Sequence, residues 1–512
     1  IFREGYDSVS WQNAMTTAAA VCAGAACFVN NTMSTAPSNN FHQLNLSGGW
    51  AFSPSTKLAG GLSYGRNTQN DSYAPTSIMQ ASGVAYNMMQ AGGLPQSSLN
   101  GSVITRHADL KLTNQTTKDL VLSAGYKFNE RDNRTASNTY LYMQIGNAAY
   151  TGVNLPYSNK KTQVEVAADY RLAKNQNIRL AYEREDIKRW CNSVADGFQC
   201  IASPSSDENK LGLTYKLKAS DNVRLNAGYA YANRSGDFDP AHVANTGNRA
   251  NRGSLLAGGG AADWVTNGGN RLGYVAYPYA SRKQDILKAG VNWQASDKLD
   301  LGLNGRHSDD RYNATLGVQD GKTTSINLDA NYAYNEQSSV SAYATWQNSE
   351  RKLSASSDLV LAGTPQYAAP AINVWTNQLK GDSNTFGLNT KHTGLMGGKF
   401  ELLGDLSYSL DKSRYSTQVP YLATCGTAAV LTCGDTPDIK SRLVTFKLTG
   451  TYHVDKKSKV VLAYRYQKLT SEDYYYNGYQ YGYTPNRVMP TNEQAPNYSV
   501  NMIAASYVYS FK

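Results

Sequence analysis

The sequence predicts an all-β protein, a large antiparallel β-barrel that crosses a membrane, and three observations predict it. Apolar residues recur at every second position over strand-length stretches. Short polar turns alternate with long loops along the chain. The composition, with 37 Tyr and 43 Gly but only 15 Pro among 512 residues, favours sheet over helix.

The length and the hydropathy pattern narrow the architecture. The longest apolar run, residues 18–29, is shorter than the roughly 20 residues that a membrane-spanning helix needs. A soluble chain of 512 residues would be expected to divide into several domains, because single hydrophobic cores stop growing at roughly 250–300 residues. A closed barrel is not bound by that limit, so we expect one barrel domain over residues 1–512.

The repeating unit is an amphipathic β-hairpin. In residues 163–172 the even-numbered positions are apolar and the odd-numbered ones are mostly polar. A polar turn follows at residues 174–177, and the alternation then resumes from Ile178 to Glu183. Because side chains alternate between the two faces of a strand, one face of this hairpin is apolar and the other is charged.

Eight hairpins of this kind follow one another, with turns at residues 53–56, 116–119, 174–177, 219–222, 295–298, 335–339, 393–399 and 455–459. Residues 497–511 add a further strand and residues 1–11 another, which gives about 18 strands. Long loops separate the hairpins, including residues 67–105, 133–161, 235–281 and 352–383. In outer-membrane barrels the short turns are periplasmic and the long loops extracellular.

A soluble β-sandwich or propeller would also alternate. Strands in soluble sheets average about 5–6 residues, whereas these stretches are about 9–11 residues long, the length of a tilted strand that crosses a membrane. Aromatic residues also lie near the strand ends, where an interfacial girdle requires them: Tyr170, Trp293, Tyr334, Trp346, Tyr452 and Tyr466. The last strand ends on Phe511 and resembles the aromatic-ended terminal strand that assembly machinery recognises, although Lys512 follows it.

The six cysteines form three local pairs, each within one predicted long loop: Cys22 and Cys27, Cys191 and Cys200, Cys425 and Cys433. Six cysteines allow 15 connectivities, and nearest-neighbour disulfides are the simplest of them. Such disulfides indicate an oxidising, non-cytoplasmic location. The sequence contains neither C-x-x-C nor C-x-x-C-H, so the chain is not expected to attach a c-type haem of its own.

No other pattern predicts chemistry carried by this chain. The six histidines are scattered and lack the spacing of metal ligands. Residues 307–310, His-Ser-Asp-Asp, could be a His/Asp catalytic pair at a barrel rim, or simply an exposed strand end. The net charge of +10 comes from interleaved charges without a long basic run, so nucleic-acid binding is not expected. We therefore expect no enzyme activity and no cofactor of its own.

The polar faces of the predicted strands would line the interior. Their charged residues carry both signs: Lys111, Lys127, Glu165, Asp169, Arg171, Arg179, Glu183, Lys216, Arg224, Lys288, Asp300, Arg306, Asp329, Lys391, Asp405, Lys447 and Arg465, together with Asp109, Lys210 and Glu401. A barrel of about 18 strands is wide enough for water or a plug. The mixture suits either a solvated pore wall or a surface that docks another protein. Inner-face glycines favour a close-fitting occupant: Gly49, Gly61, Gly65, Gly125, Gly212, Gly228, Gly290, Gly302 and Gly387.

Two kinds of sequence segment recur over nearly the whole chain and resemble those of a known family. Examples are the Tyr-rich strand at residues 225–231 and the turn segment at residues 295–301. Together with the evenly spaced hairpins they resemble the MtrB/PioB family of decahaem-associated outer-membrane porins. The resemblance implies a barrel of about 26 strands. Relatives also carry an N-terminal C-x-x-C and more hairpins, so we expect this chain to lack an N-terminal part.

The resemblance also implies a function. The barrel would lie in the outer membrane of a Gram-negative bacterium, hold a periplasmic decahaem c-type cytochrome in its lumen and support an extracellular multihaem cytochrome at the loop side. Electrons would then cross the membrane through the haems of the partners, as in extracellular metal reduction, while this chain stays redox-silent. The alternative is a general or substrate-specific diffusion porin.

Overall fold

The computed structural model describes residues 8–11, 31–34, 37–73, 77–78, 86–87, 94–145, 148–192, 201, 203–237, 274–275, 279–314, 316–356, 374–418, 434–474 and 497–511. Almost all of this part of the chain is β-structure, as the alternation predicts. No helix in it is long and apolar enough to cross a membrane.

Seventeen long strands make up the wall within the described residues. They are β3 (Asn40–Ser53), β4 (Thr56–Gln69), β7 (Gly101–Gln115), β8 (Leu120–Asn133), β11 (Tyr157–Ala173), β12 (Gln176–Cys191), β13 (Ser205–Lys218), β14 (Val223–Asp237), β16 (Arg282–Ser296), β17 (Leu299–Tyr312), β18 (Leu316–Asn335), β19 (Ser338–Ser356), β20 (Val374–Gly394), β21 (Phe400–Gln418), β23 (Ile439–His453), β24 (Ser458–Glu472) and β25 (Tyr498–Tyr509). Each long strand pairs antiparallel with the next one along the chain, from β3 to β25.

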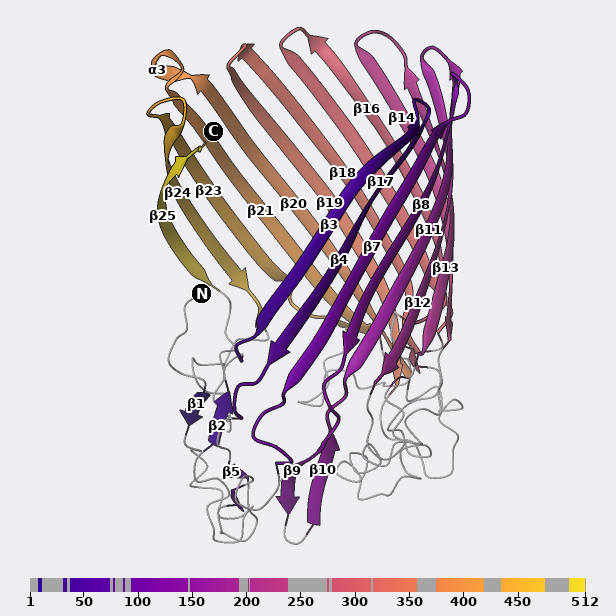
Figure 1. Cartoon of the computed structure of the whole chain (residues 1–512), viewed down its shortest axis with the longest axis vertical. Coiled ribbons are helices and arrows are strands. Elements are labelled where there is room, and N and C mark those ends of the chain that lie inside the picture. The colour runs from indigo at the N-terminus through magenta and orange to yellow at the C-terminus, as the bar shows by residue number, and fades with distance from the viewer. Residues whose placement is uncertain are drawn as a thin grey trace.

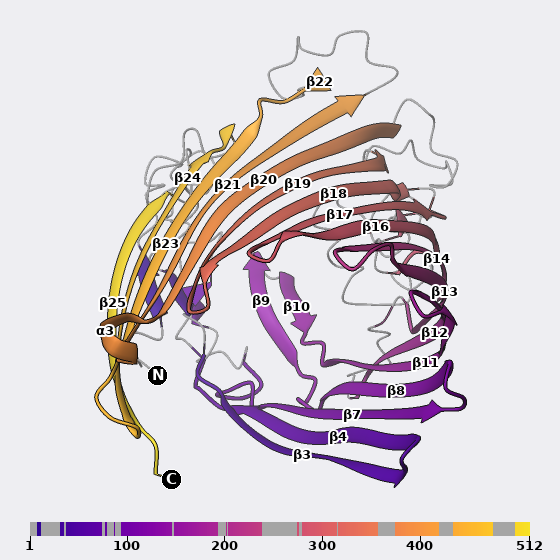
Figure 2. The same cartoon turned by 90° about the horizontal axis from the view of Figure 1, so that it is seen from above.

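The strands tilt round a hollow cylinder, with the short turns at one end and the long connections at the other (Figure 1). The order of the strands is that of a barrel in which β25 and β3 come next to each other. Although this order closes on itself, no register joins β25 to β3 in the part of the chain described, and Figure 2 shows these two strands standing apart.

The exposure of the two edge strands agrees with an open seam between them. All twelve residues of β25 are exposed, and in β3 all but Ser53 are. Strands with neighbours on both sides, such as β12, alternate between exposed and half-buried residues instead. Within the described residues, both outer edges of the sheet therefore present backbone groups without a paired strand.

Shorter elements lie outside the main wall. The hairpin of β9 (Thr139–Ile145) and β10 (Ala148–Val153) extends beyond the long-loop end, and in the axial view it lies over the bore (Figures 1 and 2). The pairs β5 (Ser77–Ile78) with β6 (Tyr86–Asn87) and β1 (Ser8–Trp11) with β2 (Asn31–Ser34) also lie at that end. At the wall, β15 (Tyr274–Val275) pairs with β18 and β22 (Gly434–Asp435) with β21, and α3 (Leu395–Gly398) forms one turn.

Two predictions about the strands were wrong. Ser8–Trp11, the described part of the strand predicted at residues 1–11, pairs locally with Asn31–Ser34 and not with the wall. The wall strands contain 12 to 21 residues instead of about 9–11, because the ladders continue past the apolar stretch toward the loops. The eight predicted turns all fall between paired strands.

Candidate functional site: the inner wall

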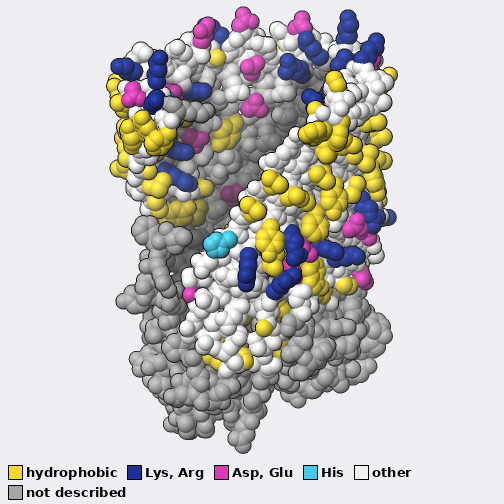
Figure 3. Space-filling view, viewed as in Figure 1, with side chains coloured by type: hydrophobic (Ala, Val, Ile, Leu, Met, Phe, Trp, Pro, Cys, Tyr) yellow, Lys and Arg dark blue, Asp and Glu magenta, His cyan; other side chains and the backbone are white. Residues whose placement is uncertain are grey.

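The strand registers divide the wall into two faces. Leu211 lies opposite Tyr231 and Leu213 opposite Tyr229, and this apolar face continues round the sheet. Figure 3 shows it on the outside of the wall, where hydrophobic side chains form a band. The other face therefore lines the bore.

The registers place all seventeen charged residues predicted for the lumen on this inner face, together with Asp109, Lys210 and Glu401. Their contact with a partner stays a prediction. Most lie in mixed-charge neighbourhoods, so the wall is polar without one dominant sign.

One such neighbourhood surrounds Arg179 on β12. Its Nη2 lies 2.7 Å from Oε1 of Glu165, and its Nη1 also donates to Oδ2 of Asp169. Glu183 lies opposite Glu165 and is 3.9 Å from the Nζ of Lys210. Arg179 thus offsets the repulsion between neighbouring carboxylates on adjacent strands.

A second charged cluster, toward the long loops, was missed by sequence reasoning. Nη2 of Arg282 lies 2.7 Å from Oε2 of Glu208, and its Nη1 lies 3.4 Å from Oδ1 of Asp310. Arg234 joins the cluster with its guanidinium over the ring of Tyr312. The sequence could have indicated this cluster, because the alternation of inner and outer residues continues beyond the predicted ends of the strands.

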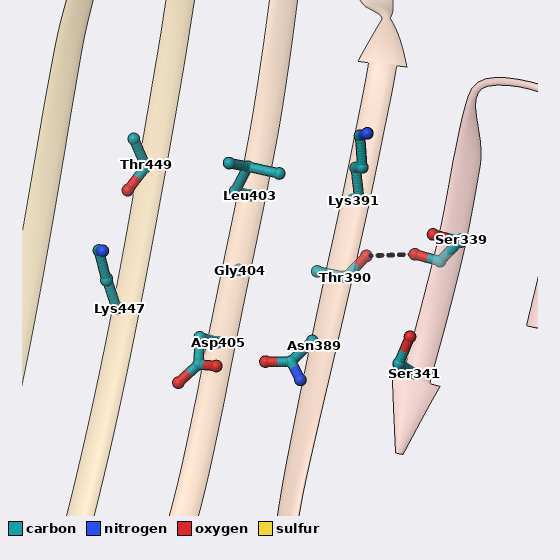
Figure 4. Close-up of a pocket in the computed structure, with 10 residues that line it drawn as sticks. All are labelled: Ser339, Ser341, Asn389, Thr390, Lys391, Leu403, Gly404, Asp405, Lys447 and Thr449. Atoms are coloured by element: carbon teal, nitrogen blue, oxygen red, sulfur yellow. Dashed lines mark hydrogen bonds between the residues drawn. The ribbon is translucent and has the colours of Figure 1, made fainter. Parts of the chain in front are cut away.

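Figure 4 shows a mixed patch on the opposite wall. Asp405 on β21 lies between Asn389 on β20 and Lys447 on β23, with which it is in register. Lys391 lies one step closer to the turns. This patch offers both hydrogen-bond donors and acceptors to the bore.

The inner-face glycines divide into two groups. Neighbouring side chains already cover some of them: a Cβ on Gly61 would lie 2.9 Å from a carboxylate oxygen of Asp109, and the ring of Tyr343 lies over Gly387. Gly65, Gly290 and Gly302 are covered in the same way. The expectation that all nine open the wall to an occupant is therefore wrong for these five.

One of the uncovered glycines, Gly212, belongs to a row of small residues. Ser123, Ala167, Ala181, Gly212 and Ala230 are consecutive cross-strand neighbours on five adjacent strands, from β8 to β14. A Cβ on Gly212 would come no closer than 3.6 Å to its neighbours. Ala181, Gly212 and Ala230 are half-buried, whereas Ala167 is only 2% exposed, and charged residues lie above and below the row.

The final strand departs from the polar inner surface. By its register with β24, the bore-facing residues of β25 are Tyr498, Val500, Met502, Ala504, Ser506 and Val508. Val500 and Met502 are each 49% exposed. On the β25 side of the seam the inner wall is therefore mostly apolar, whereas β3 on the other side presents Gln43, Asn45 and Ser47 to the bore.

The candidate catalytic residues 307–310 are divided between the two faces of β17. His307 and Asp309 lie on the outer face and Asp310 on the inner one, and Nδ1 of His307 lies 2.8 Å from the hydroxyl of Thr324. Among the described residues no group of three His, Cys, Asp or Glu side chains could hold a metal ion.

Cys191 ends β12 and is disulfide-bonded. The other five cysteines lie outside the described residues. The three predicted pairs, Cys22–Cys27, Cys191–Cys200 and Cys425–Cys433, therefore stay predictions.

The comparison with protein families decides the identity of this barrel. The profile described as "Putative outer membrane beta-barrel porin, MtrB/PioB" matches residues 1–511. The chain belongs to the MtrB/PioB family. A curated relative, outer membrane protein MtrB of Shewanella baltica (strain OS185), is 22% identical over 439 residues, which are 85% of this chain and 54% of the relative. The chain thus spans about half the length of that relative.

Solved outer-membrane proteins have weaker likeness to this MtrB/PioB chain. The copper transporter OprC is 10% identical with a TM-score of 0.49, over 93% of this chain and 74% of that one. The ferripyoverdine receptor of Pseudomonas aeruginosa is 12% identical with a TM-score of 0.45, over 95% and 61%. Family membership confirms the predicted family, the β-barrel fold and the outer-membrane location, and makes the chain a porin of the MtrB type.

Proposed function

We propose that this barrel surrounds a multihaem c-type cytochrome that enters from the periplasm, and supports a second one at the outer surface. Electrons then cross the outer membrane through the haems of the partners. The barrel keeps lipid away from them and has no redox group of its own. A hydrocarbon layer of about 30 Å is far too thick for one tunnelling step, so a chain of closely spaced cofactors has to pass through it.

The observation that carries the proposal is the small-residue row from Ser123 to Ala230. On its loop side lie Glu165, Glu183 and Lys210, and on its turn side lie Asp169 and Arg179. The short side chains of Ala181, Gly212 and Ala230, which are half-buried, let a second protein surface approach the wall, and the flanking charges fix its orientation by complementary pairing. The apolar bore-facing stripe of β25 is a further surface that another protein would cover.

A partner complex can be tested by purification. We expect a haem-containing cytochrome to elute with the barrel at a fixed haem-to-barrel ratio that persists through a second column. Liposomes that contain the complex should stay impermeable to small sugars in a swelling assay. Rapid swelling with the complex present, or a variable haem ratio, would instead favour a diffusion porin.

A further inference from the structure

A cationic groove lies at the turn end of the inner wall. It is lined by residues of β11 to β14, by Asn292 of β16 and by the turn between β11 and β12, and five of the lining residues are cations: Arg171, Lys174, Lys216, Lys218 and Arg224. All five are exposed, and no acidic residue lines the groove. The other inner-wall patches mix both signs, so this groove is distinct from them.

The registers bring these cations together. Lys216 is in register with Asn177 on one side and Asn226 on the other, and Lys218 lies directly opposite Arg224. The turn is held in place by a hydrogen bond from the amide of Asn175 to the carbonyl of Lys218, at 3.1 Å. Like charges opposite each other on adjacent strands destabilise a sheet unless an anion balances them.

Among the described residues, two acidic side chains pair with these cations, and both come from turns outside the groove. Asp221 lies 2.6 Å from Nζ of Lys218, and Asp119 lies 3.9 Å from Nη1 of Arg171. Within the described part of the chain, Lys174, Lys216 and Arg224 form no ion pair. At least three cations are thus available to a ligand.

The spread of the charges selects the kind of ligand. The cations of the groove extend over four adjacent strands, β11 to β14, which is roughly 14 Å at about 4.8 Å per strand. A single phosphate cannot reach all of these side chains at once, whereas a protein surface with several carboxylates can. The groove lies at the end of the short turns, which face the periplasm in outer-membrane barrels.

We propose that this groove binds an acidic surface of the protein that enters the bore from the periplasmic side. The inference rests on the proposed function for the presence of such a protein. The groove itself would bind an anionic protein surface whether or not that partner contains haem. Its carboxylates pair with Lys216, Arg224 and Lys174, and the amide groups of Asn177, Asn226 and Asn292 donate further hydrogen bonds. Charge complementarity then steers the partner to the mouth and fixes its rotation in the bore.

The test uses the purified full chain and a fluorescent poly-L-glutamate of about 20 residues as the probe, with binding followed by anisotropy at low ionic strength. The groove variant K216Q/R224Q removes two cations, and the control K456Q/K457Q removes two exposed lysines from the turn between β23 and β24, at the same end of the barrel. We expect binding to weaken roughly fivefold in the groove variant and to change less than about twofold in the control. An equal loss in both variants, or no loss in either, overturns the proposal.

Inorganic phosphate separates the acidic surface from a small-anion site. We expect phosphate to displace the probe no better than chloride at equal ionic strength, since screening alone acts on a dispersed site. Specific displacement by phosphate would contradict the proposal. The probe contains no haem. Binding of the probe therefore tests the groove alone, and its result does not depend on whether the complex transfers electrons. Unchanged mobility of the folded variants on unheated gels controls for misfolding.

Discussion

Gly48 and Gly60 face each other across the ladder between β3 and β4, but only Gly60 is enclosed. A Cβ on Gly60 would lie 2.6 Å from the carbonyl oxygen of Asp109 and equally close to the side chain of Leu110. A Cβ on Gly48 would meet nothing within 4 Å. The difference arises because β4 has a neighbour on both sides, whereas β3 is the edge of the open seam.

The pair gives a matched test of packing. Gly60→Ala should lower the free energy of unfolding by about 1–3 kcal/mol, because a main-chain carbonyl cannot move aside for the added methyl group. Gly48→Ala should change it by less than about 0.5 kcal/mol. Equilibrium urea unfolding, followed by tryptophan fluorescence, measures both. Equal destabilisation by the two substitutions would contradict the open surroundings of Gly48.

The seam itself predicts a pattern of hydrogen exchange. Seam-facing amides of β3 and β25 should exchange much faster than those of β11 and β12, which lie within ladders on both sides. Mass spectrometry of peptides from the purified chain measures the rates. Slow exchange in both edge strands would mean that β3 and β25 pair directly. Because an unpaired edge is not tolerated in lipid, we predict that further strands pair with these edges in the membrane.

The small-residue row predicts where large side chains would prevent the partner from binding. The double substitution A181W/G212W should lower the amount of cytochrome retained by the barrel by roughly fivefold or more, which corresponds to the loss of about 1 kcal/mol of contact. The control A227W/A289W adds the same bulk to a cross-strand pair on the outer face. The measurement is haem absorbance per barrel after purification. Full retention by A181W/G212W would show that the occupant does not touch this row.

Low pH should weaken the ion pairs of Asp438 with Arg414 and Lys412, near the long loops. Asp438 lies just before β23 and accepts hydrogen bonds from Arg414 and Lys412, at 2.9 and 2.8 Å, which lower its pKa to about 2. A carboxyl group with a lowered pKa stabilises the fold fully above its unfolded-state pKa near 3.8, and this contribution is lost as the pH falls toward 2. Wild-type stability should therefore decline between about pH 4 and pH 2, and less steeply in Asp438→Asn. Parallel pH profiles of the two proteins would contradict the role of these ion pairs.

The sequence was sufficient to assign the two faces of the wall strands, because alternation has one physical cause, the opposite environments of the two faces. It places Arg179 and Lys447 on the inner face and Leu213 on the outer one without knowledge of the fold. It could not show that Tyr343 covers Gly387, since that depends on the register between β19 and β20. Nor could it reveal the open seam, which depends on the neighbours of β3 and β25.

The groove at the turn end was only half visible in the sequence. Arg171, Lys216 and Arg224 follow the inner-face pattern, but Lys174 and Lys218 lie at or beyond the strand ends, where alternation no longer assigns a face. Four strands have to be aligned before the five cations form one surface. Cross-strand register, which sequence spacing does not fix, is therefore what creates the site.

Electron transfer across a sealed membrane tests the central claim most directly. The barrel is reconstituted, with and without its co-purifying cytochromes, in liposomes that enclose a redox dye, and a membrane-impermeant reductant is added outside. The account predicts that the dye is reduced rapidly when the cytochromes are present in the barrel, and that neither component alone supports this rate. Reduction through the barrel without any haem protein, or no reduction by the intact complex, would contradict it.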